Sequence, residues 1–306
     1  MPSSAFGASL TSSVIDVDKY QANLPGSYSD DALYIGYTRG EPVATPTDWN
    51  KGGVLRLLTY NQFSPANWSV SKILDGIGPV ASTVTRLQDK TKHNVWLYFG
   101  TGRYFTKTDD PTNVQSLFGI KDPCFSETGR PDDYKGSFGS PCTTSLSATS
   151  SGTTGVTAGS GTTLVNQTSA VSTVPASANG WFINLAAQAG SSNAERVVTD
   201  TVASINGIIT FSTFKPSVDT CSYGGTSSVW SVKFDNGGDT LSGLKGQILI
   251  QLSTGAFQQV DAGSAFTKSL NRQSDDYKGV PPKIQPAITT NSNHTPSRRI
   301  LHIQER

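Results

Sequence analysis

Aspartate residues lie at both ends of one loop near the start of the chain. Asp16 and Asp18 end a strand-like segment, and Asp30 and Asp31 precede the apolar segment Ala32–Tyr37. Calcium binds six to eight hard oxygen ligands, and carboxylates from the two ends of a loop can supply several of them. The sequence therefore predicts calcium ligands at Asp16, Asp18 and Asp31, with Asp30 as a further candidate. The closing aspartate lies farther along the chain than in a compact calcium loop, so a solvated cluster at the strand ends remains the alternative.

The three cysteines form a second candidate group. Cys124 and Cys142 enclose a loop rich in glycine, proline and aspartate that has few apolar residues to hold it. A disulfide formed in an oxidising compartment would close this loop, although two separate thiols remain an open alternative. Cys221 has no partner nearby in the sequence, so it is either inert or pairs with a group outside this chain.

The sequence gives little support for zinc binding, dinucleotide binding or hydrolase catalysis. His93, His294 and His302 are too far apart to form a zinc-type pair. The segment Gly100-Thr101-Gly102 begins like a dinucleotide fingerprint, but Phe105 stands where that motif requires glycine. No Gly-x-Ser-x-Gly motif is present, and each pair of adjacent carboxylates falls in a turn rich in glycine, serine or proline. The sequence therefore predicts a protein that is not an enzyme.

The composition indicates a neutral, turn-rich β protein of the secreted type. Only 15% of the 306 residues are charged, against about 25% in typical globular domains. The formal net charge of +1 gives no reason to expect nucleic acid or an anionic membrane surface as a partner. No apolar run approaches the ~18 residues that span a bilayer, and Met1–Tyr20 lacks the pattern of a signal peptide. An exported composition without an export signal predicts a piece of a longer precursor.

Short apolar segments separated by turn residues predict an all-β fold. The run Val95–Phe99 has no polar alternation, so both faces of this strand should be buried. Asn206-Gly207 predicts a hairpin turn. The spacing favours a sandwich, a barrel or a propeller over alternating strands and helices. The expected strands are Leu10–Asp18, Ala32–Tyr37, Gly53–Tyr60, Trp68–Leu74, Val80–Leu87, Val95–Phe99, Gln115–Ile120, Gly180–Leu185, Glu195–Thr201, Gly207–Phe214, Ser228–Phe234, Gln247–Leu252, Ala256–Val260, Lys283–Ile288 and Arg299–Gln304.

The chain divides by composition into a long β region and a tail. Residues 1–288 form the expected β domain, and residues 289–306 form a linker with a terminal strand. Within the first region, residues 143–179 are almost entirely small or hydroxylated. Such a segment is expected to bury little apolar surface, which predicts a flexible insertion.

Several sequence blocks carry a family resemblance. Together they span most of residues 14–260, and they are ALYIGY (32–37), ILDGIG (73–78), WLYFGTGRYF (96–105), QSLFGI (115–120), GWFINL (180–185), ERVVTD (195–200), FSTFKPSVDTC (211–221) and STGAF (253–257). In this order they resemble the C-terminal β-propeller region of PilY-type (PilC/PilY) proteins of the type IV pilus system.

The resemblance implies a fold, a function and a calcium site. The fold would be a β-propeller-like (quinoprotein-like) set of antiparallel sheets, incomplete here because about fourteen strands make only three to four blades of four strands. The function would be a noncatalytic one in pilus biogenesis, twitching motility and surface adhesion, with calcium at Asp16, Asp18 and Asp31. The implied partners are minor pilins, the pilus tip, a host or abiotic surface ligand and a separate N-terminal region. The implied location is the cell surface, at the pilus tip or the outer membrane.

Two other functions remain open on the sequence. A glycan-binding adhesin would stack sugars on exposed aromatic rings, and Trp49 and Trp68 are the candidates, although buried packing is the commoner role of tryptophan. A quinoprotein-like oxidoreductase would share the aromatic, glycine-rich strand ends, but no cofactor site or catalytic carboxylate is recognisable for it.

Overall fold

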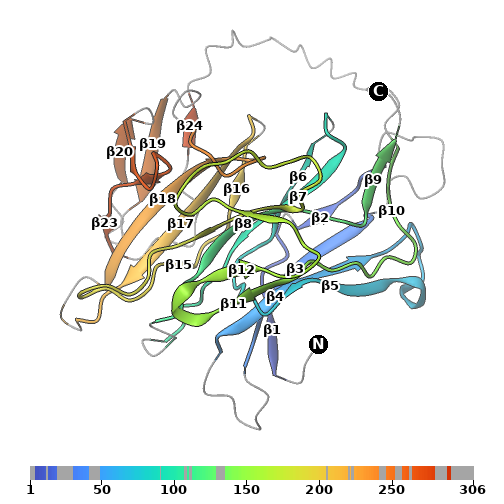
Figure 1. Cartoon of the computed structure of the whole chain (residues 1–306), viewed down its shortest axis with the longest axis horizontal. Coiled ribbons are helices and arrows are strands. Elements are labelled where there is room, and N and C mark those ends of the chain that lie inside the picture. The colour runs from blue at the N-terminus through green and yellow to red at the C-terminus, as the bar shows by residue number, and fades with distance from the viewer. Residues whose placement is uncertain are drawn as a thin grey trace, which may run out of the picture.

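The computed structural model is built almost entirely of β-strands (Figure 1). It describes residues 4–11, 13–18, 30–40, 49–89, 91–106, 109, 112–128, 135–204, 206–219, 221, 224–240, 246–251, 257–261, 264–279 and 288–290. The helical elements among these residues are two single turns of 3-10 helix, Pro65–Asn67 and Gly152–Thr154. The predicted all-β class is confirmed.

The first sheet comes from the N-terminal part of the chain. Its strands are β1 (Ala5–Gly7), β2 (Val14–Ile15), β3 (Ala32–Arg39), β4 (Lys51–Leu58) and β5 (Ser69–Asp75). The order is β1-β3-β4-β5, and β2 also pairs with β3. All pairings are antiparallel, as the prediction of blade-like sheets requires.

The second sheet contains the aromatic strand that the sequence marks as buried. Its strands are β6 (Thr85–Asp89), β7 (Asn94–Gly100), β8 (Ser116–Lys121), β13 (Leu164–Asn166) and β14 (Gly180–Asn184), in the order β13-β14-β8-β7-β6. Side chains of β7 alternate between two cores: Val95, Leu97 and Phe99 enter one, and Trp96 and Tyr98 enter the other. The prediction that both faces of this strand are covered is confirmed.

The C-terminal part of the chain forms a third sheet and a smaller, three-stranded one, and β9 (Phe125–Thr128) and β10 (Lys135–Phe138) form a separate antiparallel hairpin. The third contains β15 (Arg196–Val197), β16 (Val202–Ala203), β17 (Ile208–Pro216), β18 (Gly225–Lys233), β21 (Phe266–Lys268), β22 (Gln273–Ser274) and β23 (Tyr277–Lys278). The three-stranded sheet contains β19 (Gly246–Gln251), β20 (Phe257–Asp261) and β24 (Ile288–Thr290). Residues 206–207 occupy the predicted hairpin turn that leads into β17.

The first three sheets lie face to face, in chain order (Figure 1). One apolar core fills the space between the first and second sheets, and a separate one fills the space between the second and third. None of the described sheets closes on itself. Neighbouring blades of a propeller pack in this way, so the two cores are the interfaces between successive blade-like sheets.

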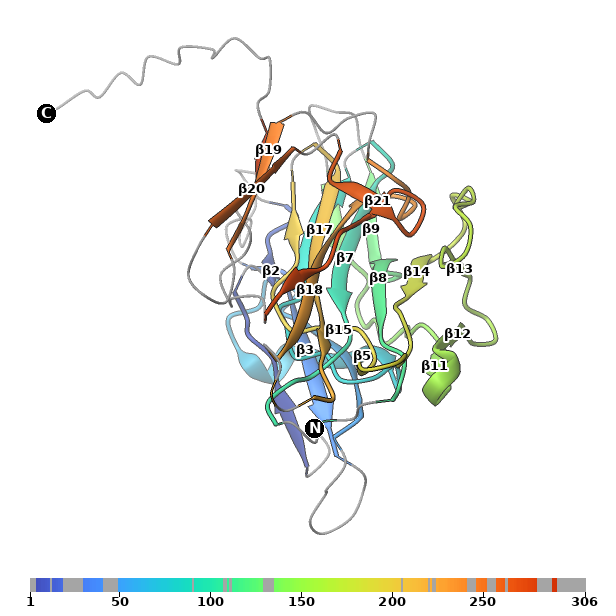
Figure 2. The same cartoon turned by 90° about the vertical axis from the view of Figure 1, so that its left-hand side faces the viewer.

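The segment 143–179 is more structured than its composition predicts. It contains the hairpin β11 (Ala148–Ser150) and β12 (Val156–Ala158) as well as β13, at one side of the stack in Figure 2. Five of its apolar residues are buried: Leu146, Ala148, Val156, Leu164 and Ala178. The expectation that it buries little apolar surface is therefore wrong, because β13 extends the second sheet and Leu146 and Val156 pack in the first core.

Some expectations differ from the structure or fall outside it. The strand expected at Leu10–Asp18 is shortened to β2, and the one expected at Val80–Leu87 begins at Thr85. Residues 283–287 and the expected strand Arg299–Gln304 lie outside the described residues. The flexibility of 143–179 and the division at residue 289 stay predictions.

Candidate metal site

Strand pairing brings the two ends of the aspartate loop together. Ile15 pairs with Ala32 where β2 runs antiparallel to β3. The backbone N–H of Asp31 donates to the carbonyl of Ile15 over 2.9 Å. Residues that follow β2 must therefore lie beside residues that precede β3, whatever the length of the chain between them.

Three of the predicted ligand residues meet at this point. One carboxylate oxygen from each of Asp16, Asp18 and Asp31 can be chosen so that all three lie within 4.8 Å of one another. Asp18 and Asp31 are 7% and 6% exposed, and Asp16 is half-buried. Asp30 is exposed and does not join the group. Its carbonyl accepts a hydrogen bond from Thr59 Oγ1 at 2.6 Å.

A fourth side chain, Asn61, was missed by the sequence reasoning. Its Nδ2 donates to Asp18 Oδ2 at 2.9 Å. Asn61 Oδ1 and Asp18 Oδ1 are both buried without a hydrogen-bond partner. Tyr60 and Asn61 have φ angles of 52° and 55°, a left-handed turn that asparagine tolerates. The turn signal at Asn61 could have been read from the sequence, but its proximity to Asp18 could not.

Burial and the nearby like charges oppose ionisation of Asp31. Desolvation, followed by repulsion from Asp18 and Asp16, raises the pKa of Asp31 to about 7. A hydrogen bond from the Val17 N–H to Asp31 Oδ2, at 2.7 Å, acts in the opposite direction. A cation would neutralise the repulsion and satisfy the buried oxygens of Asp18 and Asn61. The cluster could thus hold a metal ion.

The cysteine loop is anchored by a buried ionic group. Cys124 and Cys142 form a disulfide, with their Cα atoms 5.8 Å apart. Arg56 on β4 contacts Asp122 Oδ1 at 2.5 Å, and both side chains are fully buried. The same guanidinium donates to the carbonyls of Cys142 and Thr144, at 3.3 and 3.1 Å. Cys221 is exposed and outside any disulfide of the described chain.

The glycine turn at residues 100–102 and the two candidate tryptophans all contact other parts of the protein. Gly100 and Gly102 lie against Val197 of the third sheet, where a side chain would collide, so this turn serves sheet packing. Trp49 lies against the ring of Phe6, with a centroid separation of 4.8 Å. Trp68 is 37% exposed, and its indole N–H donates to the Gln62 carbonyl at 2.7 Å.

Comparisons with known proteins give a likeness to a solved structure. No family model matches the chain, and no curated protein matches it. Among solved structures, the chain is similar to a C-terminal domain of a PilY-type protein. That structure is the crystal structure of the Pseudomonas aeruginosa PilY1 C-terminal domain, at 16% identity and a TM-score of 0.48. The match covers 82% of this chain and 52% of that one, so this chain spans about half of its length.

Among the described residues, no helix has the length and hydrophobicity that crossing a membrane requires.

Proposed function

We propose that this chain is a noncatalytic, calcium-binding β-sheet module of a type IV pilus system. The observation that carries the calcium assignment is the convergence of Asp16, Asp18 and Asp31 within 4.8 Å, beside a buried Asp18 oxygen that lacks a hydrogen bond. Three carboxylates and the amide oxygen of Asn61 would supply four hard ligands. Water would supply the rest, since calcium accepts six to eight oxygens.

The pilus assignment rests on the family resemblance of the sequence blocks. The blocks at 96–105, 115–120, 180–185 and 211–221 contribute β7, β8, β14 and β17, the strands that line the two cores between sheets. The residues that carry the family resemblance also pack the sheets against one another. The resemblance therefore extends to the packing of the sheets as well as to single strands. We propose roles in pilus biogenesis and surface adhesion, with minor pilins as partners and a location at the cell surface.

Calcium binding is tested by isothermal titration of the EDTA-treated protein with CaCl2 at pH 7.5. The expected result is one saturable site that Asp18→Asn weakens strongly. A titration without binding heat, repeated by terbium luminescence with the same outcome, would contradict the calcium assignment.

The pilus role needs a separate experiment in the source organism. Deletion of the gene should reduce surface pili and twitching motility, and the wild-type gene should restore both. Normal pili in the deletion strain would refute the pilus assignment without touching the calcium site. A strain that carries Asp18→Asn then shows whether calcium regulates this function.

One observation favours glycan binding as a second candidate. Trp68 keeps 37% of its surface exposed, and the hydrogen bond to Gln62 fixes its ring. A fixed, partly exposed indole is a suitable surface for stacking a sugar ring. A glycan array probed with the wild type and with Trp68→Ala tests this, and equal patterns for both proteins would exclude Trp68 as the contact.

A further inference from the structure

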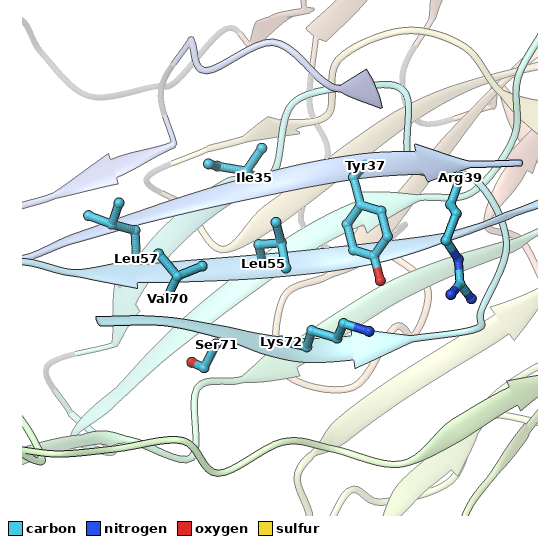
Figure 3. Close-up of a pocket in the computed structure, with 8 residues that line it drawn as sticks. All are labelled: Ile35, Tyr37, Arg39, Leu55, Leu57, Val70, Ser71 and Lys72. Atoms are coloured by element: carbon cyan, nitrogen blue, oxygen red, sulfur yellow. The ribbon is translucent and has the colours of Figure 1, made fainter. Parts of the chain in front are cut away.

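A groove lies on the outer face of the first sheet. Side chains alternate between the two faces of a strand. On β3 and β4, Tyr34, Val54 and Leu58 enter the first core, while Ile35 and Leu57 face the opposite side. The groove on that side has a volume of about 670 Å³, within the range of small-molecule sites. Figure 3 shows its lining side chains on β3, β4 and β5.

One end of the groove is apolar. Ile35, Leu55, Leu57 and Val70 line it, and they come from three adjacent strands (Figure 3). Val70, the second residue of β5, is 63% exposed. An apolar ligand would remove this surface from water, which is the main source of affinity at such a face.

The other end of the groove carries an excess of positive charge. Arg39 and Lys72 both approach Asp75, at 3.6 and 2.5 Å, and Tyr37 Oη donates to the same carboxylate at 2.5 Å. One carboxylate therefore faces two cations. Arg39 Nε is buried without a hydrogen-bond partner, and the Lys72 side chain is 46% exposed. Donors thus remain for a second anionic group at this end.

We propose that this groove binds a long-chain carboxylate. The hydrocarbon chain would lie on Ile35, Leu57 and Val70, and the head group would bind at Arg39 and Lys72. Charge complementarity selects this occupant, because the cationic end follows the apolar end along the same three strands. The proposal is independent of the calcium site and of the pilus role.

Titration with dodecanoate tests the groove directly. We would use isothermal titration of the full chain at pH 7.5, below the micelle concentration and in calcium-free buffer, because calcium precipitates fatty acids. Val70→Asp should lower the affinity at least about tenfold, since it places a charge in the apolar end. The matched control is Val218→Asp, at a valine that is 46% exposed in the loop after β17, and it should change the affinity less than about twofold.

A second comparison tests the head-group position. Lys72→Gln should weaken dodecanoate binding about two- to fivefold, the size expected of a partly exposed charge pair. The same variant should leave binding of the uncharged dodecyl maltoside unchanged. Circular dichroism and thermal melting confirm that each variant is folded.

Three results would overturn the proposal. The first is absence of dodecanoate binding to the folded wild type. The second is an equal response of Val70→Asp and Val218→Asp, which would place the ligand elsewhere. The third is a wild-type protein that is a dimer in sedimentation velocity and fails to bind dodecanoate, while Val70→Asp is a monomer. A second copy of the chain would then cover this face.

Discussion

Replacement of Asp31 by asparagine should have opposite effects with and without calcium. In the metal-free protein at pH 8, Asp31 is an ionised, buried carboxylate beside Asp16 and Asp18, and these surroundings raise its pKa to about 7. Asparagine keeps an oxygen for the Val17 N–H and removes the charge. The metal-free variant should therefore melt at a higher temperature than the metal-free wild type at this pH.

The direction of the pH dependence follows from proton linkage. Between the ordinary pKa of 3.8 and the folded value of about 7, folded Asp31 binds more protons than unfolded Asp31. The metal-free wild type therefore loses stability as the pH rises through this range, and Asp31→Asn does not. The two proteins should melt alike near pH 4, diverge as the pH rises toward about 7, and keep a constant difference above it. In the wild type, calcium binding should weaken as the pH falls below about 7, because protons compete for the same carboxylate.

Calcium should reverse the order of the two proteins. At a hundredfold excess over its dissociation constant, a ligand that binds only the folded state stabilises it by about 2.7 kcal/mol. For a chain of this size that corresponds to a rise in melting temperature of about 5 °C. The wild type should show this rise at pH 8, and Asp31→Asn should show little of it.

Differential scanning fluorimetry in EDTA and in CaCl2, from pH 4 to pH 8, measures both effects. The matched control is Asp30→Asn, which removes the same charge at an exposed neighbour and should leave all the melting curves unchanged. If Asp31→Asn responds to calcium as the wild type does, the assignment of Asp31 as a ligand is refuted. If the metal-free variant is less stable than the wild type at pH 8, the reasoning about its buried charge is refuted.

Three further predictions concern the same half of the molecule. Asn61→Ala should lower calcium affinity severalfold in calorimetry and leave one site per chain; an unchanged affinity would remove Asn61 from the ligand set. Asp122→Ala should lower the free energy of unfolding by about 3–5 kcal/mol in urea titrations, because it leaves the buried Arg56 guanidinium without its counterion, and a loss under about 1 kcal/mol would contradict this. Replacement of Cys124 and Cys142 by serine should cost about 3 kcal/mol, from the 18-residue separation that the disulfide closes, and equal urea midpoints for the oxidised and serine proteins would contradict it.

Hydrophobic pattern carried most of the information about the fold. The unbroken apolar run of β7 predicted burial on both faces, and the structure distributes its side chains between the two cores. Composition misled at residues 143–179, because it does not show that β13 joins the edge of the second sheet or that Leu146 and Val156 reach the first core. Whether a strand pairs with the edge of a sheet depends on residues far away in the sequence. The average hydrophobicity of a local segment does not reveal it.

The candidate metal site divides in a similar way between sequence and tertiary structure. Residue type and position at strand ends were enough to select Asp16, Asp18 and Asp31, because carboxylates are the ligands that calcium requires. Only the tertiary structure decided that they meet, since the pairing of Ile15 with Ala32 closes the loop and the entropy cost of closure rises slowly with loop length. Asn61 joins them from the turn after β4, and the outer groove arises where three strands lie side by side, so both depend on strand packing that no local stretch of sequence specifies.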